Sequence, residues 1–142
     1  MNISITHDVA MVTVNNIPNA TENIVKILTE IAALEVNIDM ISQTAPLKDK
    51  FNLSFSLAQS DLHKIMEVAR VFKEISPSIS TEINGYNSKI TFKSDKMKDE
   101  CGTAASIFSK LYENGIAVKM ITTAETEISC LVDGKDAENF KI

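Results

Sequence analysis

The chain has 142 residues, of which 44% are hydrophobic and 23% are charged, a balance typical of soluble globular proteins. Its net charge of −5 argues against nucleic acid as a partner, because phosphate binding needs a concentrated basic surface. No apolar run approaches the roughly 20 residues of a membrane helix, and the N-terminus lacks a secretory signal, so we expect a cytoplasmic protein without a membrane partner.

Two short strands are predicted at the N-terminus. Residues 2–6 alternate apolar and polar side chains, and His7 with Asp8 is expected to end that strand. Residues 9–14 are rich in valine and predict a second strand. The cluster of Asn and Pro over 15–19 then indicates a turn.

A helix and a second strand follow that turn. Asn19 with Glu22 three positions later resembles a capping box, so we place the helix over 20–34. Its apolar residues recur at helical spacing and predict one face packed on a sheet. Residues 37–44 read as the next strand, and the polar segment 45–49 as a hairpin-like return.

The same order of elements continues to about residue 86. Apolar and polar residues alternate over 51–57, which predicts a half-buried strand with one hydroxyl-lined face. A second helix is expected between a cap at 60–61 and a stop at 76–77, and a strand over 79–86, broken by the Asn-Gly pair at 84–85. This half of the chain therefore reads as βαββαβ, with helices on one face of an antiparallel sheet.

The rest of the chain repeats this order but lacks one strand. The strand over 2–6 is expected to fill the vacancy, which makes the first unit, residues 9–86, an insertion within a second unit of residues 2–8 plus 87–142. The elements expected in the second unit are strands over 88–93, 116–123 and 127–132, a helix over 101–114 stopped by Gly115, and the start of a helix over 136–142.

An internal repeat supports two units. Residues 36–44 contain Met-Ile followed by hydroxyl and amide groups, and residues 116–125 repeat the pattern, each copy after a helix-period segment. The predicted fold class is α+β, with two ferredoxin-like βαββαβ units.

No catalytic or metal motif is present. The sequence lacks a phosphate loop, GxGxxG, GxSxG and HExxH, and the two histidines, His7 and His63, are isolated. Cys101 and Cys130 have no CxxC partner and are interpreted as free thiols. We therefore predict no catalytic residues, no metal and no cofactor in this chain.

Polar residues near the strand ends suggest a binding site. The loop over 16–21 and the start of the strand at 37–39 are expected to meet at one end of the sheet, where the first N–H groups of a helix attract a carboxylate. Asp39 can pair with an ammonium, and Asn37 and Gln43 can add hydrogen bonds. The alternative remains open that Asn37 is a turn residue and Gln43 an edge-strand residue.

Two motifs carry a resemblance to a known family. They are Val-Asn-Ile-Asp-Met-Ile-Ser-Gln at 36–43 and Met-Ile-Thr-Thr-Ala-Glu-Thr-Glu-Ile-Ser at 120–129. Together with their helices they resemble the tandem ACT regulatory region of aspartokinase over essentially the whole chain. The resemblance implies a kinase domain on the N-terminal side that uses ATP and Mg to phosphorylate aspartate, and feedback inhibition by lysine, threonine or both, bound between ACT units of a homodimer.

The family's effector-binding residues can be carried over by position. In the first unit they correspond to Asn19, Asn37, Ile38, Asp39 and Gln43. In the second unit they correspond to Met97, Asp99, Gly102, Val118, Thr123 and Glu125.

The sequence departs from the family at several of these positions. Thr21 and Glu22 replace a Pro-Gly pair at the first helix start, which adds negative charge where an effector carboxylate would approach. Ala124 removes a hydroxyl, and Ala117 replaces a frequent Asn. We expect effector binding in at least one site, with lysine slightly favoured over threonine. Two alternatives stay open, a stand-alone amino-acid sensor and a purely structural dimerisation module.

Overall fold

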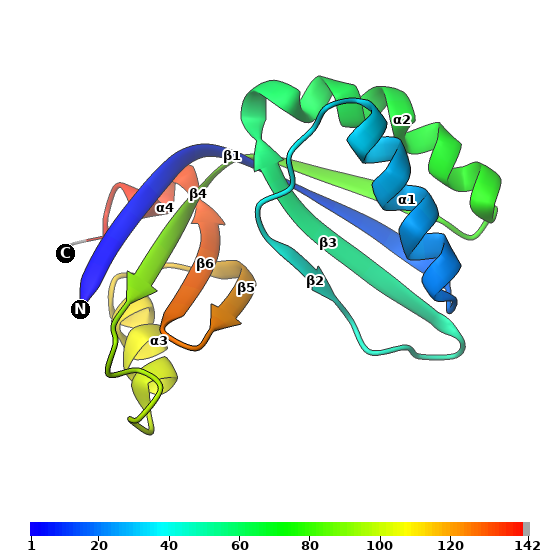
Figure 1. The fold of residues 1–142 in the computed structure, drawn as a ribbon. Helices are drawn as coiled ribbons and strands as arrows, with labels where there is room; N and C mark the ends of the chain where they lie inside the picture. The colour runs from blue at the N-terminus through cyan, green and yellow to red at the C-terminus, as the bar shows by residue number, and fades with distance from the viewer. Residues whose placement is uncertain (141–142) are drawn as a thin grey trace. The chain divides into compact units, whose positions relative to one another are not determined.

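The structure, a computed structural model, describes residues 1–140 and confirms the α+β class. The chain divides into two compact units (Figure 1), which are described separately below. Unit 1 consists of Met1–Val9 with Tyr86–Ile142, and unit 2 consists of Ala10–Gly85. Two long strands, β1 (Asn2–Pro18) and β4 (Ser80–Lys93), are shared, because one part of each belongs to unit 1 and the other part to unit 2.

Unit 2 is a βαββαβ arrangement. Its strands follow the order β2-β3-β1-β4, and β2 pairs antiparallel with β3. Between its parts of β1 and β4 lie α1 (Thr21–Ala33), β2 (Ile41–Gln43), β3 (Lys50–Ala58), a 3₁₀ turn (Gln59–Asp61) and α2 (Leu62–Ile75).

The core of unit 2 forms between its sheet and its two helices. Every second residue of β3 is buried, as the alternating pattern predicts for a strand with one covered face. Both helices cover the same face of the sheet (Figure 1). α1 packs the predicted apolar stripe against it, and α2 buries Ile65, Val68 and Phe72. The central members of this core are Phe51, Leu53, Phe55, Leu57, Ile27, Ile31, Ile65 and Phe72.

Unit 1 has the matching order, with its part of β1 at the sheet edge. Its strands follow the order β1-β4-β6-β5, and β6 pairs antiparallel with both β4 and β5. After β4 come α3 (Thr103–Glu113), β5 (Val118–Ala124), β6 (Glu127–Asp133) and α4 (Gly134–Ala137). The core includes Phe92 and Phe140, whose rings meet edge to face with centroids 5.8 Å apart.

Three predicted strand breaks are wrong. β1 continues through His7 and Asp8 and through the predicted turn at 15–17, and β4 continues through 84–85. Asp8 and Asn16 have positive φ values of 56° and 59°. Because Asp and Asn tolerate left-handed backbone, a single such residue redirects the chain locally and the strand resumes.

The second strand of unit 2 is shorter than predicted. The structure assigns only residues 41–43 to β2, although 37–44 was expected. The Met40 N–H donates to Ser56 Oγ at 2.9 Å, and the Asp39 N–H donates to the Ser56 carbonyl at 3.0 Å. A side-chain hydroxyl thus takes a backbone donor, so residues 39 and 40 follow β3 without a regular ladder.

Several helix boundaries also differ. The capping box is wrong, because α1 is capped by Ala20, which has no side-chain cap bond. α3 begins at Thr103 instead of 101, and the last helix is the four-residue α4, which begins before the predicted 136–142. Residues 141–142 of that prediction lie outside the described residues. Gly115 ends α3 with φ of 70°, as predicted.

Candidate functional site

The loop before α1 lies at the hairpin end of unit 2. The Asn19 N–H donates to the Asp49 carbonyl at 2.8 Å, and the Asn16 N–H donates to Asn52 Oδ1 at 3.0 Å. Asp49 directly precedes β3, so Asn19 lies at this end of the sheet. Gln43 ends β2 and pairs with Leu53, part-way along β3 between Asp49 and Ser56.

Asn37, Ile38 and Asp39 lie at the other end. Asp39 is hydrogen-bonded through its backbone to Ser56, seven residues along β3 from Asp49. At about 3.3 Å per residue the two ends are roughly 20 Å apart. The prediction that the 16–21 loop meets 37–39 is therefore wrong, because the strand–helix–strand crossover returns the chain to the end where the first strand began.

Unit 1 gathers five of its six predicted residues at one end. The Ser94 N–H donates to the Thr126 carbonyl at 2.9 Å, which joins the loop after β4 to the β5–β6 turn. Met97, Asp99 and Gly102 belong to that loop and its junction with α3, and Thr123 and Glu125 belong to the end of β5 and the turn. Val118 begins β5 and lies at the opposite end.

The two helix starts at these ends differ in charge. α1 has Glu22 in its first turn, and the carboxylate of Glu22 lies 3.2 Å from Lys26 Nζ in an exposed ion pair. α3 is capped by Gly102, with φ of 82°, and has no acidic residue in its first turn. Because the N-terminal end of a helix carries partial positive charge, the start of α3 is the more favourable of the two for a carboxylate.

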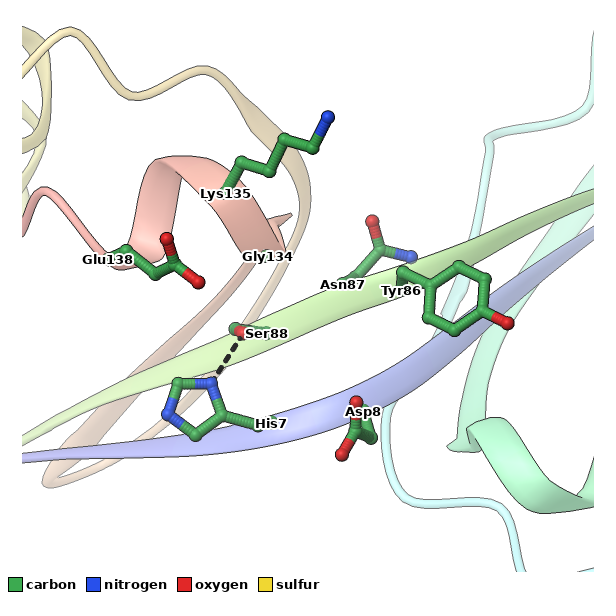
Figure 2. A pocket seen from close by; sticks show the side chains of 8 residues that line it. All are labelled: His7, Asp8, Tyr86, Asn87, Ser88, Gly134, Lys135 and Glu138. Carbon is green, nitrogen blue, oxygen red and sulfur yellow. Dashed lines mark hydrogen bonds between the residues drawn. The ribbon is translucent and has the colours of Figure 1, made fainter.

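A cavity of about 490 Å³ lies elsewhere in unit 1 and contains none of the predicted residues (Figure 2). It is lined by parts of β1, β4 and the α4 region. Its charged lining includes Asp8, Lys135 and Glu138. No motif of the repeat or of the family covers these residues, so the sequence pattern could not identify the cavity.

The described residues offer no grouped metal ligands. Within residues 1–140, no cluster of three or more His, Cys, Asp or Glu side chains is placed to hold a metal ion. Cys101 is exposed and Cys130 is buried, and burial raises the pKa of the Cys130 thiol to about 11. No helix in this part of the chain is long and apolar enough to cross a membrane.

Comparison with known proteins gives consistent relatives. The family model described as an ACT domain matches residues 90–139. An aspartokinase from Bacillus sp. (strain MGA3) is 32% identical over 126 residues, which are 89% of this chain and 31% of that protein. Aspartokinase 2 from Bacillus subtilis (strain 168) is 26% identical over 134 residues, which are 94% of this chain and 33% of that protein.

Solved structures extend the likeness to almost the whole chain. The regulatory subunit of aspartate kinase from Thermus flavus matches with a TM-score of 0.88 at 20% identity, over 98% of this chain and 92% of that one, a likeness of fold. A structure of aspartokinase alpha and beta subunits matches with a TM-score of 0.83 at 26% identity, over 95% of this chain and 88% of that one. The chain spans about a third of the length of the curated relatives it matches.

Proposed function

We propose an allosteric function for this chain, from the premise that it belongs to the ACT-domain regulatory regions of the aspartokinase family. The chain binds a free amino acid, lysine or threonine, and binding lowers the activity of an aspartate kinase catalytic domain in the cytoplasm. ATP and Mg serve that catalytic domain and are not ligands of this chain.

The separation of the predicted binding residues is the observation that carries the proposal. In unit 2, the group around Asn19 lies roughly 20 Å from the group around Asp39, farther than one amino acid can reach. A single effector can therefore contact both groups only if a second copy of the chain supplies one of them. The proposed effector site is thus completed by dimerisation.

Edge strands provide the means of pairing two copies. β2 and β5 are the outer strands of the sheet order, and their exposed backbone groups can pair with another strand. An antiparallel pairing of edge strands, as in a two-fold dimer, places the start of one strand beside the end of the other. Asn37 and Asp39 of one copy then approach the hairpin end of unit 2 in the other copy, where Asn19 lies.

The charges of these residues favour a cationic effector. Asp39, Asp99 and Glu125 are all exposed carboxylates, whereas lysine carries two ammonium groups and threonine one. The second ammonium of lysine can pair with one of these carboxylates, while the helix start at Gly102 suits its carboxylate. We therefore favour lysine over threonine.

Inhibition requires that the effector bind the inhibited arrangement better than the active one. A usual allosteric coupling is about 1–3 kcal/mol, and it acts equally in both directions. An aspartate kinase that carries this chain should therefore bind lysine less tightly when its catalytic domain is held in the active state.

Isothermal titration calorimetry of the chain with L-lysine and L-threonine tests the proposal. We expect heat from lysine at millimolar concentration or below. Asp39→Asn should weaken binding about tenfold or more, the cost of one charge-assisted contact, whereas the exposed Glu30→Gln of α1 should change it less than twofold.

Absence of heat from both amino acids would overturn amino-acid sensing. If Asp39→Asn then changed self-association in sedimentation experiments, the result would favour the structural dimerisation module. Binding with no effect on a covalently linked or added kinase domain would favour the stand-alone sensor.

A further inference from the structure

The cavity in unit 1 is built from three separate chain segments (Figure 2). His7 and Asp8 come from β1, Tyr86 and Ser88 from β4, and Lys135 and Glu138 from α4 and its C-cap. Its volume of about 490 Å³ lies in the range of small-molecule sites. None of the eleven residues predicted for effector binding lines it.

A glycine fixes the approach of α4 to β4 beside this cavity. A Cβ atom at Gly134 would lie 2.7 Å from the Tyr86 carbonyl oxygen, closer than real Cβ contacts allow. Asp133 caps α4 by accepting the Lys135 N–H at 2.9 Å through Oδ1. The start of α4 is therefore held against the strand by close backbone packing and a cap.

Two polar side chains of the lining are almost fully buried and held in place. Ser88 is 1% exposed, and a 3.0 Å hydrogen bond joins its Oγ to Nδ1 of His7, as Figure 2 shows. Asn87 is 0% exposed, and its Oδ1 accepts from Lys119 Nζ at 2.5 Å. Lys119 Nζ also lies 3.7 Å from Asp133 Oδ2, so the wall of the cavity and the cap of α4 belong to one network.

Two residues with left-handed backbone lie at the same place. Asp8 and Tyr86 have φ values of 56° and 58°, and both residues line the cavity. Left-handed backbone is costly for a bulky side chain such as Tyr, and it persists where the surrounding structure imposes it, commonly at ligand sites. The packing of Gly134 against the Tyr86 carbonyl provides such a constraint.

We propose that this cavity is a second binding site for a free α-amino acid, separate from the effector site. Lys135 supplies a positive charge for the carboxylate, and Asp8 and Glu138 supply negative charges for the ammonium. The two acids disfavour phosphate and other dianions, and the charged, polar lining is poorly suited to an apolar ligand. A molecule with both charges matches the lining best.

The test is an NMR titration of the isotope-labelled chain with each of the twenty proteinogenic amino acids in turn, up to about 10 mM. We expect at least one amino acid to shift the backbone amides of Ser88, Lys135 and Glu138. For the best binder, the analogue without the ammonium and the analogue without the carboxylate should each bind at least about tenfold more weakly.

Matched charge variants locate the site. Lys135→Met and Glu138→Gln change exposed side chains of the cavity, and Lys110→Met and Glu113→Gln change exposed side chains on α3. The cavity variants should weaken binding at least about fivefold, and the α3 variants less than twofold. Gly134→Ala should also reduce binding by displacing α4, and the charge variants keep the test valid if that variant does not fold.

The second site would be overturned if none of the twenty amino acids shifted these three amides. Equal weakening of binding by the cavity variants and the α3 variants would overturn it too. The outcome is independent of the proposed effector site. Asp39→Asn should leave the shifts at Lys135 and Glu138 intact, so loss of these shifts in Asp39→Asn alone would assign them to the effector site and contradict the proposal.

Discussion

The two units place opposite charges at matching positions of the internal repeat. Asp39 precedes Met-Ile in unit 2, and Lys119 precedes Met-Ile in unit 1. Lys119 is bonded to Asn87 and lies 3.7 Å from Asp133, whereas Asp39 is an exposed residue before the edge strand β2. The repeated fold has therefore kept its backbone while this position holds a lysine of an internal network in one unit and an exposed aspartate in the other.

A shared feature makes this difference easier to interpret. Thr13 and Ser54 are joined by a 3.0 Å hydroxyl hydrogen bond in unit 2, and Thr91 and Ser129 by one of 3.1 Å in unit 1. These pairs occupy corresponding places on the central strands. The central strands of both units thus share a hydroxyl pair, whereas the residue before Met-Ile differs in charge.

The largest expected effect comes from the aromatic residues of the two cores. Phe55 on β3 and Phe92 on β4 are both 0% exposed. Phe55→Ala and Phe92→Ala should each lower the free energy of unfolding by about 3–5 kcal/mol, because each leaves a cavity. Urea denaturation measures the loss, and hydrogen exchange should locate its greatest effect in the mutated unit. A loss below about 1 kcal/mol in either variant would contradict the assigned core.

Removing Lys119 should have the next largest effect. Lys119→Met leaves Asn87 and Asp133 without this cation and should destabilise the chain by about 1–3 kcal/mol. Lys110→Met, on the exposed face of α3, should change stability by less than about 0.5 kcal/mol. Equal effects of the two variants in urea denaturation would show that the network is not stabilising.

The ends of α1 and α3 give a mirrored pair of variants. Glu35 after α1 has φ of 58°, and Gly115 after α3 has φ of 70°. Gly115→Glu should cost about 1 kcal/mol, and Glu35→Gly should stabilise by up to about 1 kcal/mol, because only glycine adopts this backbone without strain. Thermal melts of both variants provide the measurement. Stability changes of the same sign in the two variants would contradict this prediction.

The smallest effect concerns the buried thiol of unit 1. Its raised pKa, about 11 against a usual 9.0, means that the folded state holds the Cys130 proton more tightly than the unfolded state does. This contribution to stability is complete well below pH 9. About 0.4 kcal/mol of it is lost at pH 9, and the loss grows as the pH rises towards 11. Cys130→Ala should lack this pH dependence between pH 8 and 10.

The same residue makes a kinetic prediction. At pH 8 a thiol reagent should modify exposed Cys101 rapidly and buried Cys130 only on unfolding, because the thiolate is the reactive form. Cys101→Ser should remove the fast reaction and leave the slow one. Two thiols that react at equal rates would contradict the burial of Cys130.

Sequence periodicity was sufficient for the helices and for the α+β class. The apolar stripes of α1, α2 and α3 placed each helix within a few residues, and Gly115 marked a helix end correctly. Strand continuity was harder to predict. Asp8, Asn16 and Gly85 belong to residue types that usually mark turns, and only pairing with neighbouring strands shows that here the strands continue.

The geometry of the proposed site could not be predicted from the sequence. The motifs gave the polar residues, whereas the direction of the crossover decides that Asn19 and Asp39 lie at opposite ends of one sheet. The cavity of unit 1 was not predicted at all, because it depends on the packing of Gly134 against the Tyr86 carbonyl, a contact between residues 48 positions apart with no periodic pattern.

A crystal structure of the chain grown with L-lysine is the decisive measurement for the proposed effector site. We expect a dimer in which lysine contacts Asn37 or Asp39 of one copy and a helix-start loop of the other, at Asn19 or Gly102. Lysine bound to one isolated copy, or absent from these residues in a dimer, would contradict it.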